Sequence, residues 1–182
     1  GDGTFTEVSD QIGAENYWPW GLSVADLNAD GYNDVFITAS MNYPFRYGIN
    51  SLLLNNRGQE FLDSEFILGV EPRAEDKTEV GWFEVDCSVD KGHRACEGFD
   101  QAVAMYGNNP KVTVMAPRGS RSSVIFDLDD DGDLDIVANE FNSEPLVFIS
   151  DLAEKTSIGY LKIQLEGSQS NRDGLGARVT VQ

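Results

Sequence analysis

The sequence predicts an all-β fold built from short antiparallel strands, and three observations support this. Runs of β-branched and aromatic residues recur along the chain. Clusters of Gly, Asn, Asp and Pro separate these runs, as tight turns do. Two of the turns share one acidic pattern and are each flanked by apolar runs, so each is expected to be the bend of a β-hairpin.

The first unit, residues 1–73, contains a series of short apolar runs separated by turns. Short strands joined by tight turns form a meander, which is the unit of a β-propeller blade. We therefore predict propeller-type blades, either partial or completed by other copies of the chain. The predicted strands of this unit are residues 4–8, 22–25, 35–39, 51–54, 60–62 and 65–68.

The second unit, residues 122–150, repeats the pattern with predicted strands at 122–126, 135–139 and 145–149. Its acidic loop begins at Asp127, 101 residues after the matching Asp26, whereas a blade takes roughly 40–50 residues. Residues 74–121 are therefore predicted to be a disulfide-stapled insertion or a degenerate blade.

The last unit, residues 151–182, has a different pattern. Residues 160–165 and 177–181 alternate between apolar and polar, and a turn-forming cluster lies between them. We predict a C-terminal β-hairpin module here.

The two acidic loops have oxygen-bearing side chains at alternate positions around a glycine. Side chains at the first, third, fifth and ninth positions, with the backbone carbonyl at the seventh, can converge on one hard cation, and Ca²⁺ tolerates this irregular geometry better than Mg²⁺. The predicted ligands of two Ca²⁺ sites are Asp26, Asn28, Asp30, Tyr32 through its carbonyl and Asp34, and then Asp127, Asp129, Asp131, Asp133 through its carbonyl and Asp135.

Two other interpretations of these loops are open. They could be solvated acidic turns, because Asp, Asn and Gly are ordinary turn residues. They could also belong to a helix–loop–helix calcium hand, but that motif needs Glu three residues after the ninth position, where this chain has Ile37 and Ala138.

The charge and the cysteines restrict the possible partners and the compartment. With 31 acidic and 13 basic residues the net charge is −18, which disfavours binding to nucleic acid or to anionic membranes. No apolar run is long enough for a membrane span, and the absence of an initiator Met suggests a processed product of a longer precursor. Cys87 and Cys96 are expected to form a disulfide in an extracellular setting, because a zinc site would need further ligands.

No catalytic arrangement is identified, so we do not expect an enzyme. His93 is the only histidine, and a lone loop histidine is usually solvated. Arg172 and Arg178 could pair with the acidic loops. Several aromatic side chains could form a sugar-stacking surface near the first loop, although packing in the core is the commoner use of such residues. They are Tyr17, Trp18, Trp20, Tyr43, Phe45 and Tyr47.

The two loops between strands, together with the opening residues 1–5, resemble the FG-GAP or VCBS repeats of integrin α-chain propellers and of many secreted bacterial proteins. Residues 170–181 are similar to the ASPIC/UnbV module of proteins related to cartilage acidic protein. The resemblance implies a calcium-binding β-propeller that is extracellular, serves adhesion or assembly, has no established reaction and uses the ligands named above. A complete propeller has about four to eight blades, so either the chain is a fragment or other copies complete its edges.

The expected function is therefore an extracellular calcium-binding structural or adhesion module that self-assembles through exposed strand edges. Its expected partners are calcium and other copies, or an extracellular protein or glycan. Two alternatives remain open at this point. One is a carbohydrate-binding or polysaccharide-acting domain that uses the aromatic surface, and the other is a scaffold domain of a larger enzyme.

Overall fold

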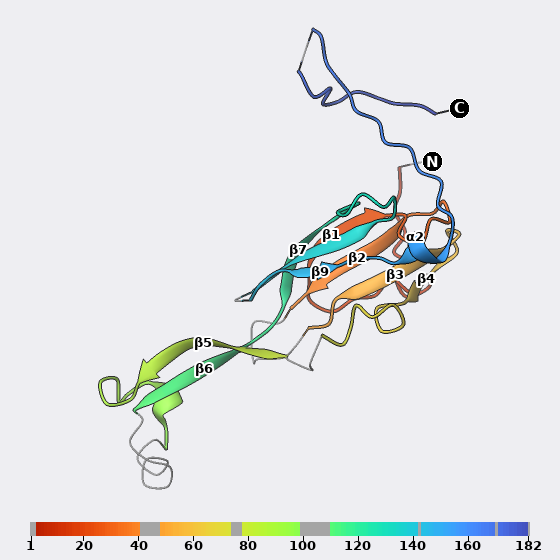
Figure 1. The fold of residues 1–182 in the computed structure, drawn as a ribbon. Helices are drawn as coiled ribbons and strands as arrows, with labels where there is room; N and C mark the ends of the chain where they lie inside the picture. The colour runs from red at the N-terminus through yellow and green to blue at the C-terminus, as the bar shows by residue number, and fades with distance from the viewer. Residues whose placement is uncertain are drawn as a thin grey trace.

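The structure is a computed structural model and describes residues 3–40, 48–73, 78–98, 110–141, 143–169 and 171–181. In this part of the chain the strands form three antiparallel sheets, and helical structure is limited to two short segments (Figure 1). The predicted all-β class is confirmed.

The first sheet is a four-stranded meander in the order β1-β2-β3-β4. Its strands are β1 (Pro19–Ala25), β2 (Asp34–Ala39), β3 (Ser51–Asn56) and β4 (Glu60–Asp63). The first acidic loop joins β1 to β2, and these strands pair in antiparallel register from Ala25 opposite Asp34. The prediction that this loop is the bend of a hairpin is therefore confirmed.

The second sheet has three strands in the order β7-β8-β9. These are β7 (Ser120–Phe126), β8 (Asp135–Glu140) and β9 (Leu146–Phe148). Phe126 pairs with Asp135, just as Ala25 pairs with Asp34 in the first sheet, so the second acidic loop is also a hairpin bend. Among the described residues this sheet has no counterpart of β4.

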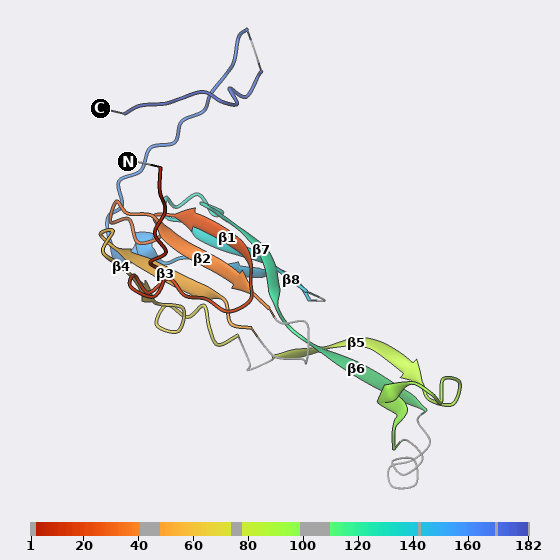
Figure 2. The ribbon, with the colours of Figure 1, turned by 180° about the vertical axis from the view of Figure 1, so that it is seen from behind.

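The core lies between these two sheets. Phe36 of β2 is fully buried, and its ring meets that of Phe148 from β9 edge-on, with centroids 6.4 Å apart. Strands β1 and β7 run side by side in both views (Figures 1 and 2), and the Ser23 and Ser123 hydroxyls are 2.7 Å apart across this junction. The arrangement is consistent with two neighbouring propeller-type blades. The buried core residues are Phe36, Leu52, Val70, Ile136 and Ala138.

A buried ionic network also joins the two sheets. Arg73, at the end of the first unit, donates to the Glu140 carboxylate of β8 at 2.5 Å and to the Ser120 hydroxyl of β7 at 3.3 Å. Glu71 accepts from the backbone N–H of Asn50 and lies 3.9 Å from the Arg73 guanidinium. Because removing one partner from a buried charge pair leaves the other charge uncompensated, this network favours one relative placement of the sheets.

The described part of residues 74–121 forms a two-stranded ribbon, β5 (Glu79–Asp86) with β6 (Lys111–Pro117), which projects from the two sheets (Figures 1 and 2). The predicted Cys87–Cys96 disulfide is present, with Cα atoms 5.5 Å apart. The two cysteines pack with Val85, so the disulfide forms the centre of a small separate core. The 3-10 helix η2 (Arg94–Cys96) lies beside β6.

Four predicted strands are wrong. Residues 4–8 form no strand, and residues 65–68 form a turn. The described parts of 160–165 and 177–181 are extended but unpaired, so the C-terminal β-hairpin module does not form there. After β9 comes the helix α2 (Leu152–Lys155), and the chain then passes the second acidic loop before it runs away from the sheets (Figure 1). Alternation identifies a chain with one apolar face, but a strand also needs a neighbour that accepts its backbone hydrogen bonds.

No helix among the described residues is long and apolar enough to cross a membrane.

Candidate metal centre

The two acidic loops share one backbone conformation. Ala29 and Gly31 in the first loop have φ values of 57° and 91°, and Asp130 and Gly132 at the matching positions of the second have 71° and 100°. Side chains with a Cβ resist these values, most strongly near +90° to +100°, which explains the glycine at the sixth position of both loops. The two loops are therefore structural repeats.

In the first loop the side chains bind the loop's own backbone. Asp26 accepts hydrogen bonds from Asp30 N at 3.0 Å and Gly31 N at 2.8 Å, one on each carboxylate oxygen. Asn28 also accepts from Asp30 N at 3.1 Å, and Asp30 accepts from Tyr32 N at 2.9 Å. These bonds stabilise the bend from within the loop.

The ninth residue of the first loop, Asp34, is fully buried. One carboxylate oxygen accepts from Leu27 N and the other from Asn55 N, both at 2.8 Å. Asp34 thus ties the loop to the end of β3. Because its carboxylate is desolvated, the pKa of Asp34 is raised above its ordinary value of 3.8, although the two backbone hydrogen bonds oppose the shift.

The second loop differs, because three of its carboxylates converge. Asp127, Asp129 and Asp135 each place one oxygen within 4.8 Å of the others. Across the described residues this is the one group of three or more Asp, Glu, His or Cys side chains that meets this distance. The Oδ1 atom of Asp127 is buried without a hydrogen-bond partner there, which suits a site that takes a cation.

The other acidic residues of the second loop serve the surrounding structure. Asp135 repeats the role of Asp34, accepting from Leu128 N at 2.7 Å and from Ser150 N at 2.9 Å. Asp133 is buried, and its side chain accepts from Ala153 N at 2.8 Å, which ties the loop to α2. Its carbonyl, and not its carboxylate, was the predicted ligand, so this side-chain role was not foreseen.

The charges of the second loop act on one another. Partial desolvation, together with the negative charges of Asp131 and Asp135, raises the pKa of Asp129. The pKa of Asp127 is lowered instead, chiefly by a hydrogen bond from the Lys162 ammonium. A divalent cation would relieve the repulsion among these carboxylates.

Lys162 is the neighbour of this site that the sequence did not reveal. Its Nζ lies 3.0 Å from Asp127 Oδ2 and also contacts Asp130 Oδ1. Arg172 and Arg178 were the basic residues suggested for such a role. A single lysine in an alternating segment carries no signal for this contact, since only the path of the chain after α2 brings it to the loop.

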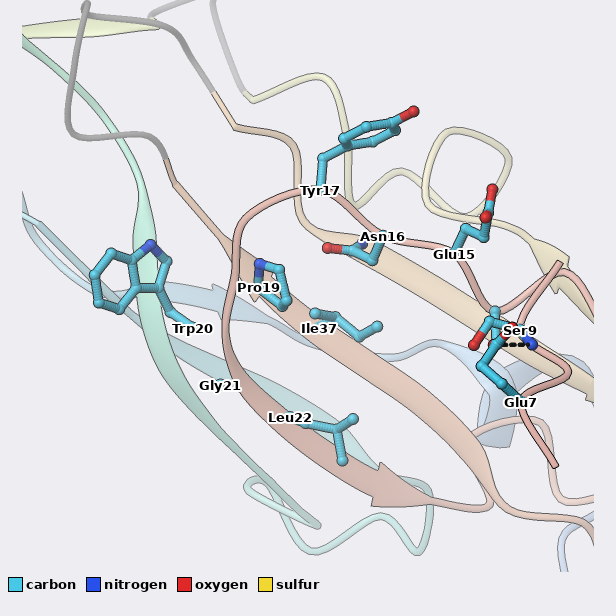
Figure 3. Close-up of a pocket in the computed structure, with 11 residues that line it drawn as sticks. Glu7, Ser9, Glu15, Asn16, Tyr17, Pro19, Trp20, Gly21, Leu22 and Ile37 are labelled. Atoms are coloured by element: carbon cyan, nitrogen blue, oxygen red, sulfur yellow. Dashed lines mark hydrogen bonds between the residues drawn. The ribbon is translucent and has the colours of Figure 1, made fainter. Parts of the chain in front are cut away.

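The predicted aromatic surface is only partly described, because Tyr43, Phe45 and Tyr47 lie outside the described residues. Tyr17 and Trp20 line an open groove of about 650 Å³, which Figure 3 shows with Trp20 at one end and Glu7 and Ser9 at the other. Trp20 is engaged within the fold, since its Nε1 donates to Ser40 O at 2.8 Å and the Arg121 guanidinium lies 4.2 Å from its ring centroid.

His93 has a local structural role in the ribbon. Its Nδ1 accepts a hydrogen bond from Ala95 N at 3.1 Å and thereby caps the start of η2. Its ring also meets that of Phe83 edge-on, with centroids 6.1 Å apart.

Comparison with known families bears on the start of the chain. Residues 1–37 match the family model of the FG-GAP-like repeat. The match includes β1 and the whole first acidic loop, so the prediction of an FG-GAP repeat is confirmed for this stretch. No curated protein and no solved structure matches the chain. The resemblance of residues 170–181 to the ASPIC/UnbV module stays a prediction.

Proposed function

We propose that this chain is a calcium-binding structural module of an extracellular or cell-surface protein. The observation that carries the proposal is the convergence of Asp127, Asp129 and Asp135 within 4.8 Å at the bend between β7 and β8. FG-GAP-like repeats occur in adhesion modules of the integrin type, and the Cys87–Cys96 disulfide suits an oxidising compartment.

Calcium would act here as a structural cross-link. The carboxylates of Asp127, Asp129 and Asp135 would hold it, with Asp131 and the Asp133 carbonyl as the remaining predicted ligands. The bend joins β7 to β8, while Asp133 and Asp135 connect the loop to α2 and to the end of β9. A cation that neutralises the loop would therefore stiffen the second sheet at the end where its three strands meet the loop.

The test is calcium titration with matched variants. We expect the wild type to bind CaCl₂ with a Kd of roughly 10⁻⁴–10⁻³ M and to gain about 1–3 kcal/mol of unfolding free energy at saturating calcium relative to EDTA. Asp129→Asn should reduce this gain by about 1.4 kcal/mol, the equivalent of tenfold weaker binding at the second loop. Asp90→Asn removes the same charge from the exposed tip of the ribbon and should leave the gain intact. Equal melting of the wild type in calcium and in EDTA would refute the proposal.

The more specific part of the proposal is self-association through a strand edge, and β9 is the best candidate. The outer edge of β4 is partly covered, because Phe61 N donates to Ile12 O at 2.7 Å. β9 is the last strand of its sheet. Among the described residues no strand pairs with its outer edge, where a counterpart of β4 would lie. An open edge of this kind is a template for another strand. Sedimentation in millimolar CaCl₂ tests this, and a stable monomer at high protein concentration would contradict it.

The groove of Figure 3 supports a second candidate, the binding of a neutral carbohydrate. Tyr17 is 86% exposed and lines the groove together with Glu7, Glu15 and Asn16, which combine a flat ring with polar groups. We expect Tyr17→Ala to abolish such binding in an oligosaccharide titration. Trp18→Ala is the comparison variant, because Trp18 does not line the groove. No binding by the wild type to any neutral oligosaccharide tested would remove this candidate.

A further inference from the structure

The segment that follows α2 returns to the second acidic loop and places a cation there. Lys162 Nζ lies 3.0 Å from Oδ2 of Asp127, the first predicted calcium ligand of this loop. The same ammonium contacts Asp130, the exposed residue at the fourth position. A lysine side chain is protonated at neutral pH, so this ammonium carries a positive charge beside the loop.

A second contact fixes this segment to the same loop. A Cβ built on Gly132 would lie 2.2 Å from Cε1 of Tyr160, so the tyrosine ring rests directly on the glycine at the bend. The Lys162 ammonium lies 5.6 Å from the centroid of that ring. In the first loop, by contrast, a Cβ on Gly31 would meet nothing within 4 Å. The covering of the second loop is therefore a property of this segment and not of the loop motif.

We propose that Lys162 is a tethered competitor of the divalent cation at the second loop, so that cation binding and docking of residues 160–165 weaken each other. This inference rests on the proposed calcium site. The two ions would bind different oxygens of Asp127, Oδ1 for the cation and Oδ2 for Lys162, so they oppose each other through charge repulsion. A calcium ion takes six to eight oxygen ligands and needs Asp127, whereas an ammonium 3.0 Å from Asp127 Oδ2 would then face a double positive charge at close range.

A competing lysine and an ordinary surface ion pair would respond differently to calcium. An exposed pair between Lys162 and an acidic residue would contribute little to stability and would not respond to calcium. A tethered competitor weakens calcium binding at the second loop, and calcium in turn releases the segment, because the coupling between two ligands of one protein is reciprocal. Calcium would then determine whether residues 160–165 are docked on the second loop or detached from it.

The first measurement compares calcium affinity in three proteins by calorimetry with CaCl₂, each carrying Asp30→Asn to weaken the first loop. The proteins are otherwise wild type, Lys162→Gln and Lys155→Gln. Lys155→Gln is the matched control, because Lys155 also forms an ion pair, with Asp151 at 2.7 Å, and its substitution removes the same charge. We expect Lys162→Gln to raise the affinity of the second loop about three- to tenfold, since two charge contacts oppose the cation, while Lys155→Gln changes it by less than about twofold.

The second measurement follows release of the segment in the unsubstituted protein. Endoproteinase Lys-C cleaves after lysine and can be used with or without calcium. We expect cleavage after Lys162 to accelerate several-fold as CaCl₂ saturates the site, with cleavage after Lys91, at the exposed tip of the ribbon, as the internal reference. If calcium binds the Lys162→Gln and Lys155→Gln proteins with equal affinity, this inference is wrong. It is also wrong if calcium binds the unsubstituted protein without changing the rate of cleavage after Lys162. The proposed calcium site would stand in both cases. No calcium binding in any protein overturns the proposed function and this inference with it.

Discussion

The two acidic loops have the same length, the same glycine and the same backbone, yet their side chains are used differently. In the first loop both carboxylate oxygens of Asp26 accept hydrogen bonds from backbone N–H groups of the loop. In the second loop Asp127 has a buried oxygen without a partner, and its other oxygen is bound by Lys162. The difference shows that the motif specifies the bend, whereas contacts with other segments determine which carboxylate oxygens are available to bind a cation.

The largest expected effect tests the feature that the loops share. Asp34→Ala and Asp135→Ala each remove the acceptor of two backbone N–H groups at the end of a strand. We expect each to lower the unfolding free energy by about 3 kcal/mol, because buried donors without partners are costly. Urea denaturation in EDTA measures this, with the exposed Asp90→Ala as control. If the two losses differ by more than about 1 kcal/mol, the loops are not structurally equivalent.

A smaller effect is expected at the bend glycines. Gly31→Ala and Gly132→Ala place a Cβ at φ values of 91° and 100°, and each should cost about 1–2 kcal/mol in the same denaturation assay. Gly132→Ala should also displace Tyr160, whose ring occupies the position of the new methyl group. Faster Lys-C cleavage after Lys162 in Gly132→Ala, but not in Gly31→Ala, would sharpen the contrast between the loops. Unchanged cleavage in both would show that Tyr160 does not hold the segment.

The third position of each loop offers an exchange experiment. The first loop has Asn28 where the second has Asp129. Because carboxylate count tunes calcium affinity, Asp129→Asn should weaken binding at the second loop about tenfold, equivalent to ~1.4 kcal/mol. Asn28→Asp should strengthen binding at the first loop in the same calorimetric titration. If Asn28→Asp has no effect, the hydrogen bonds within the first loop, and not its missing carboxylate, limit its affinity.

The smallest effects are those of pH, and they have opposite signs. The pKa of Asp34 is raised by burial, so the stability it contributes grows as the pH falls through its folded pKa, above 3.8. The pKa of Asp127 is lowered by Lys162, so the stability from that pair is present above 3.8 and is lost as the pH falls through the depressed folded pKa. Carboxyl NMR titration in EDTA should place Asp34 above and Asp127 below 3.8. Lys162→Gln should move Asp127 back towards 3.8 and leave Asp34 unchanged, and an unmoved Asp127 would contradict the pairing.

Much of the fold around the loops follows from local sequence. Apolar runs flank each acidic turn, and they form the hairpins β1–β2 and β7–β8 as expected. The disulfide was predictable from the two cysteines and their setting. Local sequence patterns misled where no neighbouring strand was available, at residues 4–8 and at the C-terminal segment. The Arg73–Glu140 network joins residues 67 positions apart, and no local sequence pattern predicts such a contact.

What the sequence determined by itself is the geometry of two bends: the oxygen-bearing side chains at alternate positions and the glycines at Gly31 and Gly132, with strands on either side. These are effects of near neighbours in the chain, governed by allowed φ values and by side-chain spacing. Only the tertiary structure decided that Lys162 contacts Asp127 and Asp130 and that Tyr160 covers Gly132. Those contacts depend on where α2 and the segment after it run, which is set by packing between distant parts of the chain.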